Sequence, residues 1–169
     1  RAALASMFEA EADGLDEILQ SRTLRAPRPV CHGTSGNVAF LVLEFLEFGS
    51  AGDAAKMGHG LAALHLHTAD RFGWKRNNTI GSTPQDNTWT DAWVHFWREH
   101  RLGAQLRLAQ KNGLGPALQK LRDPLLETLP AFFSSYSPVP SLLHGDLWGG
   151  NAAFLRDGEP VVFDPAVYY

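Results

Sequence analysis

The chain has 169 residues and a formal charge of −3, with 44% hydrophobic and 20% charged residues. This balance is typical of a globular protein with a buried core and excludes wholesale disorder. We expect no nucleic-acid or membrane partner, because there is no basic block and no apolar run of roughly 20 residues. Cys31 is the only cysteine, which excludes an internal disulfide and suits a reducing compartment, so we expect a cytoplasmic location.

The first half of the chain alternates predicted helices with extended segments. Residues 2–20 carry apolar side chains at helical spacing and predict a helix. The continuous apolar run 38–45 predicts a buried strand, and the glycine-containing residues 33–37 before it predict a β-turn. Residues 47–53 are rich in turn formers and indicate a hinge or linker. The pattern of residues 54–69 is helical again.

The second half begins with a long polar segment, residues 72–87, which is rich in Gly, Asn, Thr and Pro. We expect it to be an ordered functional loop, because structureless loops of this length are uncommon in compact domains. Residues 89–109 and 114–133 predict helices, with a break near Pro124. Two short apolar runs within residues 152–163, separated by Arg-Asp-Gly-Glu, predict a β-hairpin.

The chemistry is indicated by a polar string that precedes this hairpin. Residues 144–151 read HGDLWGGN, so that Asn151 follows Asp146 by five residues, and Asp164 lies thirteen residues beyond Asn151. Asp-x-x-x-x-Asn is the spacing of the protein-kinase catalytic loop. Phosphoryl transfer from ATP needs one carboxylate as the base, and an amide and a second carboxylate as Mg²⁺ ligands. The alternative is a purely structural role, in which the string is a polar turn and Asp146 and Asn151 cap backbone groups.

The same string, followed by FDPAVYY at residues 163–169, resembles the fructosamine kinases, which belong with the aminoglycoside phosphotransferases and choline kinases. LAALH at residues 61–65 resembles a helix motif of the wider group, and residues 72–85 resemble a segment of the fructosamine kinases. The resemblance runs from Phe8 to Tyr169. It implies an α+β, protein-kinase-like fold of two lobes and ATP-dependent phosphorylation of the sugar 3-hydroxyl of glycated amines.

The resemblance also implies roles for individual residues. Asp146 would be the catalytic base, and Asn151 and Asp164 would bind magnesium. The helix glutamate that pairs with the phosphate-binding lysine maps best to Glu11, with Glu9 as its rival. The hinge that takes the edge of adenine through backbone groups maps to the following residues: Glu44, Phe45 and Leu46.

The acceptor would be a small molecule, a glycated amine or an amino sugar. Trp148 offers an apolar platform in the catalytic loop that could stack on the sugar or simply pack. Asn78 and Thr79, in the polar segment 72–87, could line the acceptor site. The amides and hydroxyls of this segment suit a neutral sugar better than a polycationic aminoglycoside, which favours acid-lined clefts.

The resemblance divides the chain at its hinge. Residues 1–46 would form a partial N-lobe, and residues 47–169 would form a mostly helical C-lobe. Both ends look cut, because the glycine-rich strands, the phosphate-binding lysine and the final helices of the family have no counterpart in the sequence. Two alternatives stay open: another small-molecule kinase, of the aminoglycoside or choline type, and a catalytically inactive kinase fragment.

Overall fold

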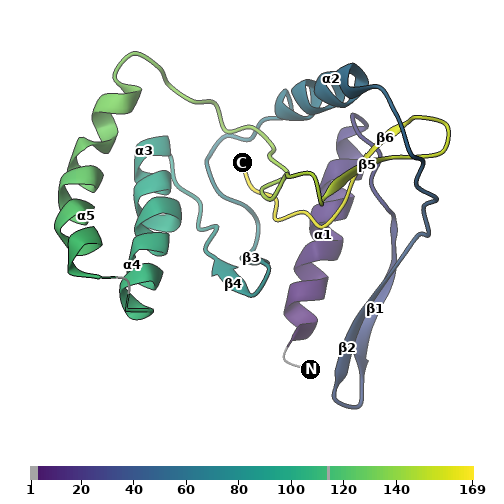
Figure 1. Cartoon of the computed structure of the whole chain (residues 1–169), viewed down its shortest axis with the longest axis horizontal. Helices are drawn as coiled ribbons and strands as arrows, with labels where there is room; N and C mark the ends of the chain where they lie inside the picture. Colours follow the sequence, from purple (N-terminus) through teal and green to yellow (C-terminus); the bar gives the residue numbers. More distant parts are fainter. Residues whose placement is uncertain (1–3, 114) are drawn as a thin grey trace.

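A computed structural model describes residues 4–113 and 115–169. The first residues of the predicted helix 2–20 and Leu114 lie outside the described residues. Helices and short antiparallel hairpins follow one another along the chain (Figure 1), so the α+β class is confirmed. The elements are α1 (Ala5–Ser21), β1 (Pro29–Ser35), β2 (Val38–Leu43), α2 (Ala54–His65), β3 (Asn78–Ile80), β4 (Thr83–Gln85), α3 (Trp93–Phe96), η2 (Trp97–Leu102), α4 (Gly103–Lys111), α5 (Pro116–Thr128), η3 (Leu129–Phe133), β5 (Ala152–Phe154) and β6 (Pro160–Val162).

The core is built around α1. Leu15 and Ile18 of this helix are fully buried and pack with Leu64 of α2 and Val162 of β6. Figure 1 shows α1 in the middle of the molecule, with α2 across one of its ends and the β5–β6 hairpin beside it. The spacing of Leu15 and Ile18 places them on one face of α1. The opposite end of the molecule consists of α3, α4 and α5 (Figure 1).

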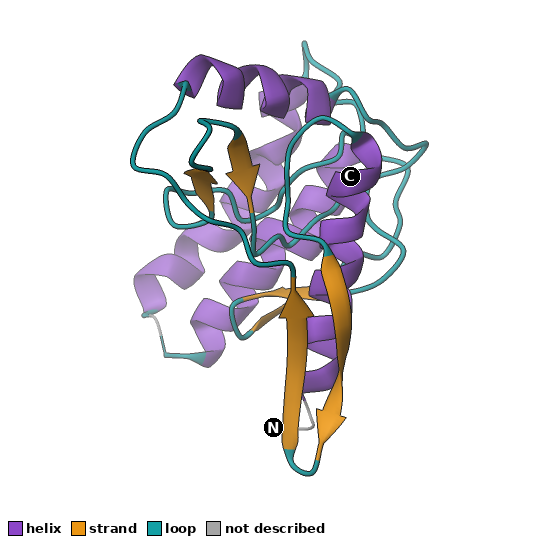
Figure 2. Ribbon diagram, turned by 90° about the vertical axis from the view of Figure 1, so that its right-hand side faces the viewer, coloured by secondary structure: helices purple, strands orange, loops and turns teal. Residues whose placement is uncertain are grey.

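The β1–β2 hairpin projects from the body of the molecule (Figure 2). The turn predicted at residues 33–37 is confirmed at Gly36, with a φ of 57°, and Asn37, whereas residues 33–35 belong to β1. The prediction of a buried strand at 38–45 is wrong in its burial, because the side chain of Val38 is 61% exposed and Phe40 and Val42 are also exposed. Ala39 is buried, as strand alternation requires, so only one face of the ribbon is covered by the described residues.

The predicted helix 89–109 has different ends and an irregular middle. It begins at Trp93 and continues to Lys111, through the π-helical turn η2. Trp89 lies before the helix and stacks on Tyr169, with 6.3 Å between ring centroids. The helix predicted for 54–69 ends at His65. The second helical region is confirmed, although Pro124 lies inside α5 and the break comes at η3.

The polar segment 72–87 is ordered, as predicted, and contains the hairpin β3–β4, in which Asn78 pairs with Gln85. The predicted hairpin within 152–163 is also confirmed as β5–β6. These two hairpins come from distant parts of the sequence. The candidate site lies between the β3–β4 hairpin and the segments that directly precede β5 and follow β6.

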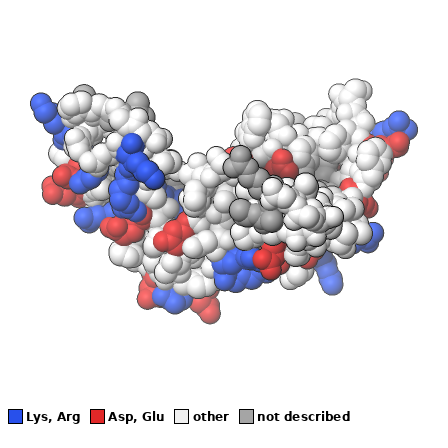
Figure 3. Space-filling model, turned by 90° about the horizontal axis from the view of Figure 1, so that it is seen from below, with Lys and Arg blue, Asp and Glu red and all other residues white. Residues whose placement is uncertain are grey.

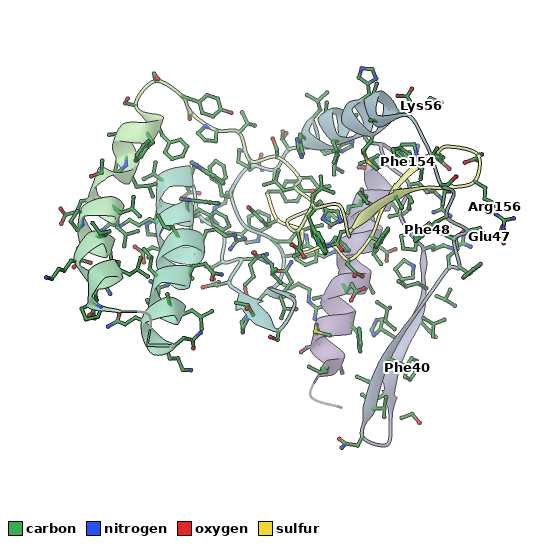
Figure 4. All side chains as sticks on the ribbon, in the orientation of Figure 1. Phe40, Glu47, Phe48, Lys56, Phe154 and Arg156 are labelled. Atoms are coloured by element: carbon green, nitrogen blue, oxygen red, sulfur yellow. The ribbon has the colours of Figure 1, made fainter. Side chains whose placement is uncertain are left out.

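The linker 47–53 is fixed against β5–β6 by several contacts. Gly49 N donates to the Phe154 carbonyl at 2.8 Å, and the rings of Phe48 and Phe163 stack with 5.3 Å between centroids. Glu47 and Arg156 form an ion pair at 3.1 Å. Figure 4 shows Glu47 and Arg156 together at the edge of the molecule. The linker is therefore held at the hairpin that precedes Asp164.

Basic and acidic residues are nearly equal in number, 15 and 18. Figure 3 shows acidic and basic side chains interspersed over the face seen there. Of the helices among the described residues, none combines the length and the apolar character needed to span a membrane.

Candidate active site

The string 144–151 forms a tight loop ahead of β5. Gly145 has a φ of 82°, in the left-handed region, and its Cα lies against the backbone of Ala166. A side chain at position 145 would overlap the Ala166 carbonyl oxygen, so only glycine permits this approach. The Ala166 amide donates to the His144 carbonyl at 2.9 Å and ties the loop to the segment that follows Asp164.

His144 is a buried scaffold residue of this loop. Its Nε2 donates to the carbonyl oxygen of Phe163 at 3.0 Å, and its Nδ1 accepts the Asp146 amide at 3.4 Å. Burial lowers the pKa of His144, so the neutral imidazole is favoured and can play both roles at once. His144 thereby connects the loop that carries Asp146 to the end of β6, next to Asp164.

The predicted base and the two predicted metal ligands come together at Asn151. Its Nδ2 donates to the Asp146 carbonyl at 2.9 Å and to Asp146 Oδ2 at 3.2 Å, and it lies 3.5 Å from the Asp164 carbonyl. Because the nitrogen is committed to these oxygens, Asn151 Oδ1 is the atom left to reach an ion. Asp164 has a φ of 54°, an uncommon conformation for a residue other than glycine.

A cavity of about 460 Å³ opens above these groups. It is lined by residues from α1, from the β3–β4 hairpin, from the catalytic loop and from the segment at Asp164. Seven of the ten residues that the sequence predicted for the site line this cavity: Glu11, Asn78, Thr79, Asp146, Trp148, Asn151 and Asp164. Segments more than 130 residues apart therefore meet at one place, as a catalytic site requires.

Glu11 is the only one of the two candidate helix glutamates that lines the cavity. Burial, together with the negative charge of Asp164 and a hydrogen bond with it, raises the pKa of Glu11 to about 7. Glu9 instead forms an ion pair with Arg76 at 2.8 Å, and the same guanidinium binds Asp13 at 2.6 Å. Arg76, which sequence reasoning missed, thus clamps α1 to the segment before β3.

The predicted acceptor residues differ in what they offer to the cavity. The Trp148 ring is 64% exposed and lies over Gly150, so one of its faces is available. Thr79 is partly buried and also lines the cavity. Asn78 is buried, and all the polar atoms of its side chain are engaged within the protein. Asn78 therefore supports the cavity wall, in contrast to the direct acceptor contact predicted for it.

The three predicted hinge residues do not line this cavity. The Glu44 carboxylate forms an ion pair with Arg25 at 2.6 Å and accepts the Arg28 amide at 3.1 Å, contacts that lower the pKa of Glu44. The Glu44 amide donates to the Arg28 carbonyl, Phe45 is highly exposed, and Leu46 is partly buried. The carboxylate and the amide of Glu44 are thus engaged within the protein, which leaves its carbonyl group for a ligand.

The donor set of the cavity suits a magnesium ion. Burial first, and then the nearby charge of Asp164, raises the pKa of Glu11, and no cation among the described residues offsets the repulsion between the two carboxyl groups. A divalent cation would relieve this repulsion. Within the described part of the chain, no cluster of three His, Cys, Asp or Glu side chains is arranged to hold a metal ion. Mg²⁺ usually takes only one or two protein carboxylates and keeps water or phosphate oxygens, so Asn151 and Asp164 fit its needs.

The fold and this cavity place the chain among proteins with a kinase-like fold. A family model described as fructosamine kinase matches residues 1–169, and the chain belongs to the fructosamine kinase family. The chain is 47% identical to a probable ketoamine kinase of Synechocystis over 96% of its length, and 42% identical to a chloroplastic protein-ribulosamine 3-kinase of Arabidopsis thaliana over 97%.

A solved structure agrees with these sequence relatives. The crystal structure of a Haemophilus somnus protein described as a putative fructosamine-3-kinase superposes with a TM-score of 0.88 at 30% identity and covers 98% of the chain. The chain spans only 55% of the Synechocystis relative, 52% of the Arabidopsis relative and 56% of the crystallised chain. The relatives are thus about twice as long as the region matched here.

Proposed function

We propose that the protein transfers the γ-phosphoryl group of ATP to a sugar hydroxyl of a glycated amine. The observation that carries this proposal is the convergence of Asp146, Asn151, Asp164 and Glu11 on one cavity, in a member of the fructosamine kinase family. A polar turn with capping side chains would not require the distant α1 and β3–β4 segments to meet at the same groups.

In the proposed reaction, Asp146 orients the acceptor hydroxyl and accepts its proton as the hydroxyl oxygen bonds to the γ-phosphorus. The bond between that phosphorus and the β,γ-bridging oxygen breaks, and ADP leaves. Asn151 holds the Asp146 carboxylate through its Nδ2. Asn151 Oδ1 and Asp164 would hold Mg²⁺, which neutralises phosphate charge when bound.

The nucleotide base would lie at the hinge, where the Glu44 carbonyl and the backbone groups of Phe45 and Leu46 would meet it. This assignment divides the protein into an N-terminal lobe, residues 1–46, and a C-terminal lobe, residues 47–169. It is supported by the linker 47–53, which is fixed on the hairpin that ends next to Asp164. Glu11 would face the phosphates from α1, where the family resemblance implies that it pairs with the phosphate-binding lysine.

The acceptor would enter from the side of Trp148 and Thr79. An exposed indole face suits a sugar ring, whose C–H groups stack on aromatic surfaces while its hydroxyls stay hydrated. Ketoamine and ribulosamine are the acceptors in the names of the relatives. We therefore propose a small glycated amine as the partner. A cytoplasmic location stays a prediction from the single cysteine.

The test is a phosphorylation assay of the complete gene product with Mg·ATP and four acceptors: fructosyl-lysine, ribulosyl-lysine, an aminoglycoside and choline. We expect a phosphate ester on at least one ketosamine, detected by ³¹P NMR, and no turnover of the other two compounds. Turnover of the aminoglycoside or choline alone would move the protein to another kinase class. ATP binding without transfer to any acceptor would indicate an inactive relative.

A further inference from the structure

We infer that a buried polar network centred on Asn78 positions Asp164 by holding the segment that follows it, residues 165–168. The four network residues are Asn78, Gln85, Asn87 and Arg101. The inference rests on the proposed role of Asp164 as a metal ligand, and it assigns Asn78 a positioning role in place of acceptor contact. Nothing in the catalytic spacing predicts these residues.

The segment 165–168 is bonded on both of its sides. On one side it contacts the residues that lead into the catalytic loop, since the Ala166 amide donates to the His144 carbonyl and the Leu143 amide donates to the Tyr168 carbonyl, both at 2.9 Å. On the other side it faces the β3–β4 hairpin. Gln85 Nε2 donates to the Ala166 carbonyl at 3.1 Å, and Asn78 Nδ2 donates to the Val167 carbonyl at 2.9 Å.

Asn78 is the centre of the network. Its Oδ1 accepts Gln85 Nε2 at 2.8 Å and Asn87 Nδ2 at 2.9 Å, so its donor and its acceptor are both committed. Asn78 is 7% exposed and Asn87 is 1% exposed. Buried amides leave costly unsatisfied groups when a partner is removed, so the members of this network constrain one another.

Arg101 connects this network to the end of the segment. It is 8% exposed and lies in the π-helical turn η2, a rare geometry that recurs at functional sites. Its Nη2 donates to Asn87 Oδ1 at 2.6 Å, and its Nη1 donates to the Asp86 carbonyl at 2.8 Å. The guanidinium also lies 4.0 Å from the centre of the Tyr168 ring, which it holds by a cation–π contact.

The conformation of Asp164 explains why such support is needed. Its φ of 54° is sparsely populated for a residue other than glycine, and it departs from the extended conformation that the following Pro165 favours. Such conformations persist only where the surrounding structure over-determines them. The contacts to Ala166, Val167 and Tyr168 supply that constraint, so the carboxylate of Asp164 is held toward the cavity before any ion arrives.

The experiment compares Gln85→Met with Asn77→Ala in the complete gene product. Gln85 contacts Ala166 and does not line the acidic cavity, so its loss acts only through the network. Asn77 is the matched control, because its Oδ1 accepts the Asn87 amide in the same region without touching residues 165–168. Two quantities are measured: Mn²⁺ affinity with a non-hydrolysable ATP analogue, by electron paramagnetic resonance, and hydrogen exchange of residues 165–169 without ligand.

We expect Gln85→Met to weaken Mn²⁺ binding roughly tenfold, as the loss of groups that support metal ligands does, and to speed exchange at 165–169. Asn77→Ala should change neither quantity by more than about twofold, within the usual effect of a surface substitution. Wild-type affinity and wild-type exchange in Gln85→Met would overturn the inference. Equal losses in both variants would also overturn it, because they would show general loosening of the hairpin.

Two other outcomes need a different comparison: a Gln85→Met protein that does not fold, and a wild-type protein that lacks kinase activity or Mn²⁺ binding. If Gln85→Met does not fold, Arg101→Lys replaces it, because lysine keeps the charge but loses the planar fork that meets Asn87 and Tyr168. The same two measurements and limits then apply. If the wild-type protein binds Mn²⁺ with the nucleotide but phosphorylates no ketosamine, the proposed function fails while the inference is still tested. If it binds no Mn²⁺, the metal role fails, and hydrogen exchange alone decides whether the network holds the segment.

Discussion

At the scale of single residues, His144 shows how a buried side chain fixes a catalytic loop. Its neutral ring donates to Phe163 and accepts from Asp146, and a proton on Nδ1 would remove the second contact. Burial lowers its pKa below the ordinary value of about 6.5, so the unfolded chain takes up a proton at a higher pH than the folded one does. Acid therefore favours the unfolded state.

We predict the following pH dependence. The contribution of neutral His144 to stability is fully present above pH ~6.5 and is lost as the pH falls toward the lowered pKa, by at most about 1.4 kcal/mol per pH unit. His144→Gln, which keeps a side-chain donor for Phe163, should have a free energy of unfolding that depends less on pH in this window. Urea titrations at several pH values measure the slope. Equal slopes in both proteins would show that His144 does not carry this dependence.

Trp148 offers a second prediction at this scale. If its exposed ring stacks on the acceptor, Trp148→Ala should raise KM for a fructosamine roughly 2–10-fold, the equivalent of about 0.5–1.5 kcal/mol of aromatic contact. KM for ATP should stay within about twofold, because the ring lies on the acceptor side. Steady-state kinetics separates the two constants. A change in KM for ATP alone would place Trp148 on the nucleotide side.

At the scale of structural elements, the catalytic loop depends on a close backbone approach. Gly145→Ala would force a side chain into the Ala166 carbonyl at a positive φ, so we predict a loss of about 1–3 kcal/mol in the free energy of unfolding, or more. Gly149→Ala is the control from the same loop, because a Cβ at this position meets no atom within 4 Å. It should cost no more than about 0.5 kcal/mol. Similar losses in both variants would show that the approach at Gly145 is not what constrains the loop.

The sequence predicted the elements whose signals are local. The spacing from Asp146 through Asn151 to Asp164 spans one loop and one hairpin, so short-range rules suffice to bring these residues together. The turn within 33–37 and the ordered conformation of residues 72–87 were likewise predicted from the residue types of these segments. The burial of residues 38–45 could not be predicted in this way. An apolar run shows that a strand has side chains suited to burial, but it does not show whether another element packs over them.

Other features depend on contacts between distant segments and have no periodic signal. The roles of Gln85, Asn87 and Arg101 arise from partners on other elements, and polar residues in a loop usually face water. The π-helical turn η2 was missed because its sequence is compatible with an ordinary helix. Asn78 was predicted as an acceptor residue because its segment resembles one of the fructosamine kinases. Only the hydrogen bonds of its side-chain amide show that it supports the wall of the cavity.

At the scale of the whole molecule, two features of the described residues call for further partners. Glu11 is buried beside Asp164 and pairs with no cation of the described chain, and the outer face of β2 exposes Val38, Phe40 and Val42. We predict that the 169 residues alone bind Mg·ATP weakly and turn over negligibly, because phosphoryl transfer depends on positioned positive charge around the phosphates.

The comparison is between the 169-residue chain and the complete gene product, with any residues that flank the chain there. Only the second should phosphorylate a fructosamine, as followed by ADP release. Comparable activity in the shorter chain would mean that the nucleotide site is misplaced, and the glycine-containing turn at residues 33–37 would become the next candidate for contact with phosphate. Circular dichroism of both chains controls for folding.

The central claim, that the cavity at Asp146 is the catalytic centre, is tested most directly by Asp146→Asn in the complete gene product. The amide keeps the shape of the side chain but cannot accept the hydroxyl proton. We predict that kcat for a ketosamine falls by ~10²–10⁴, the usual contribution of a general base, while calorimetry shows nearly unchanged affinity for Mg·ATP. Turnover close to that of the wild-type protein would contradict the account and return Asp146 to a capping role in a polar turn.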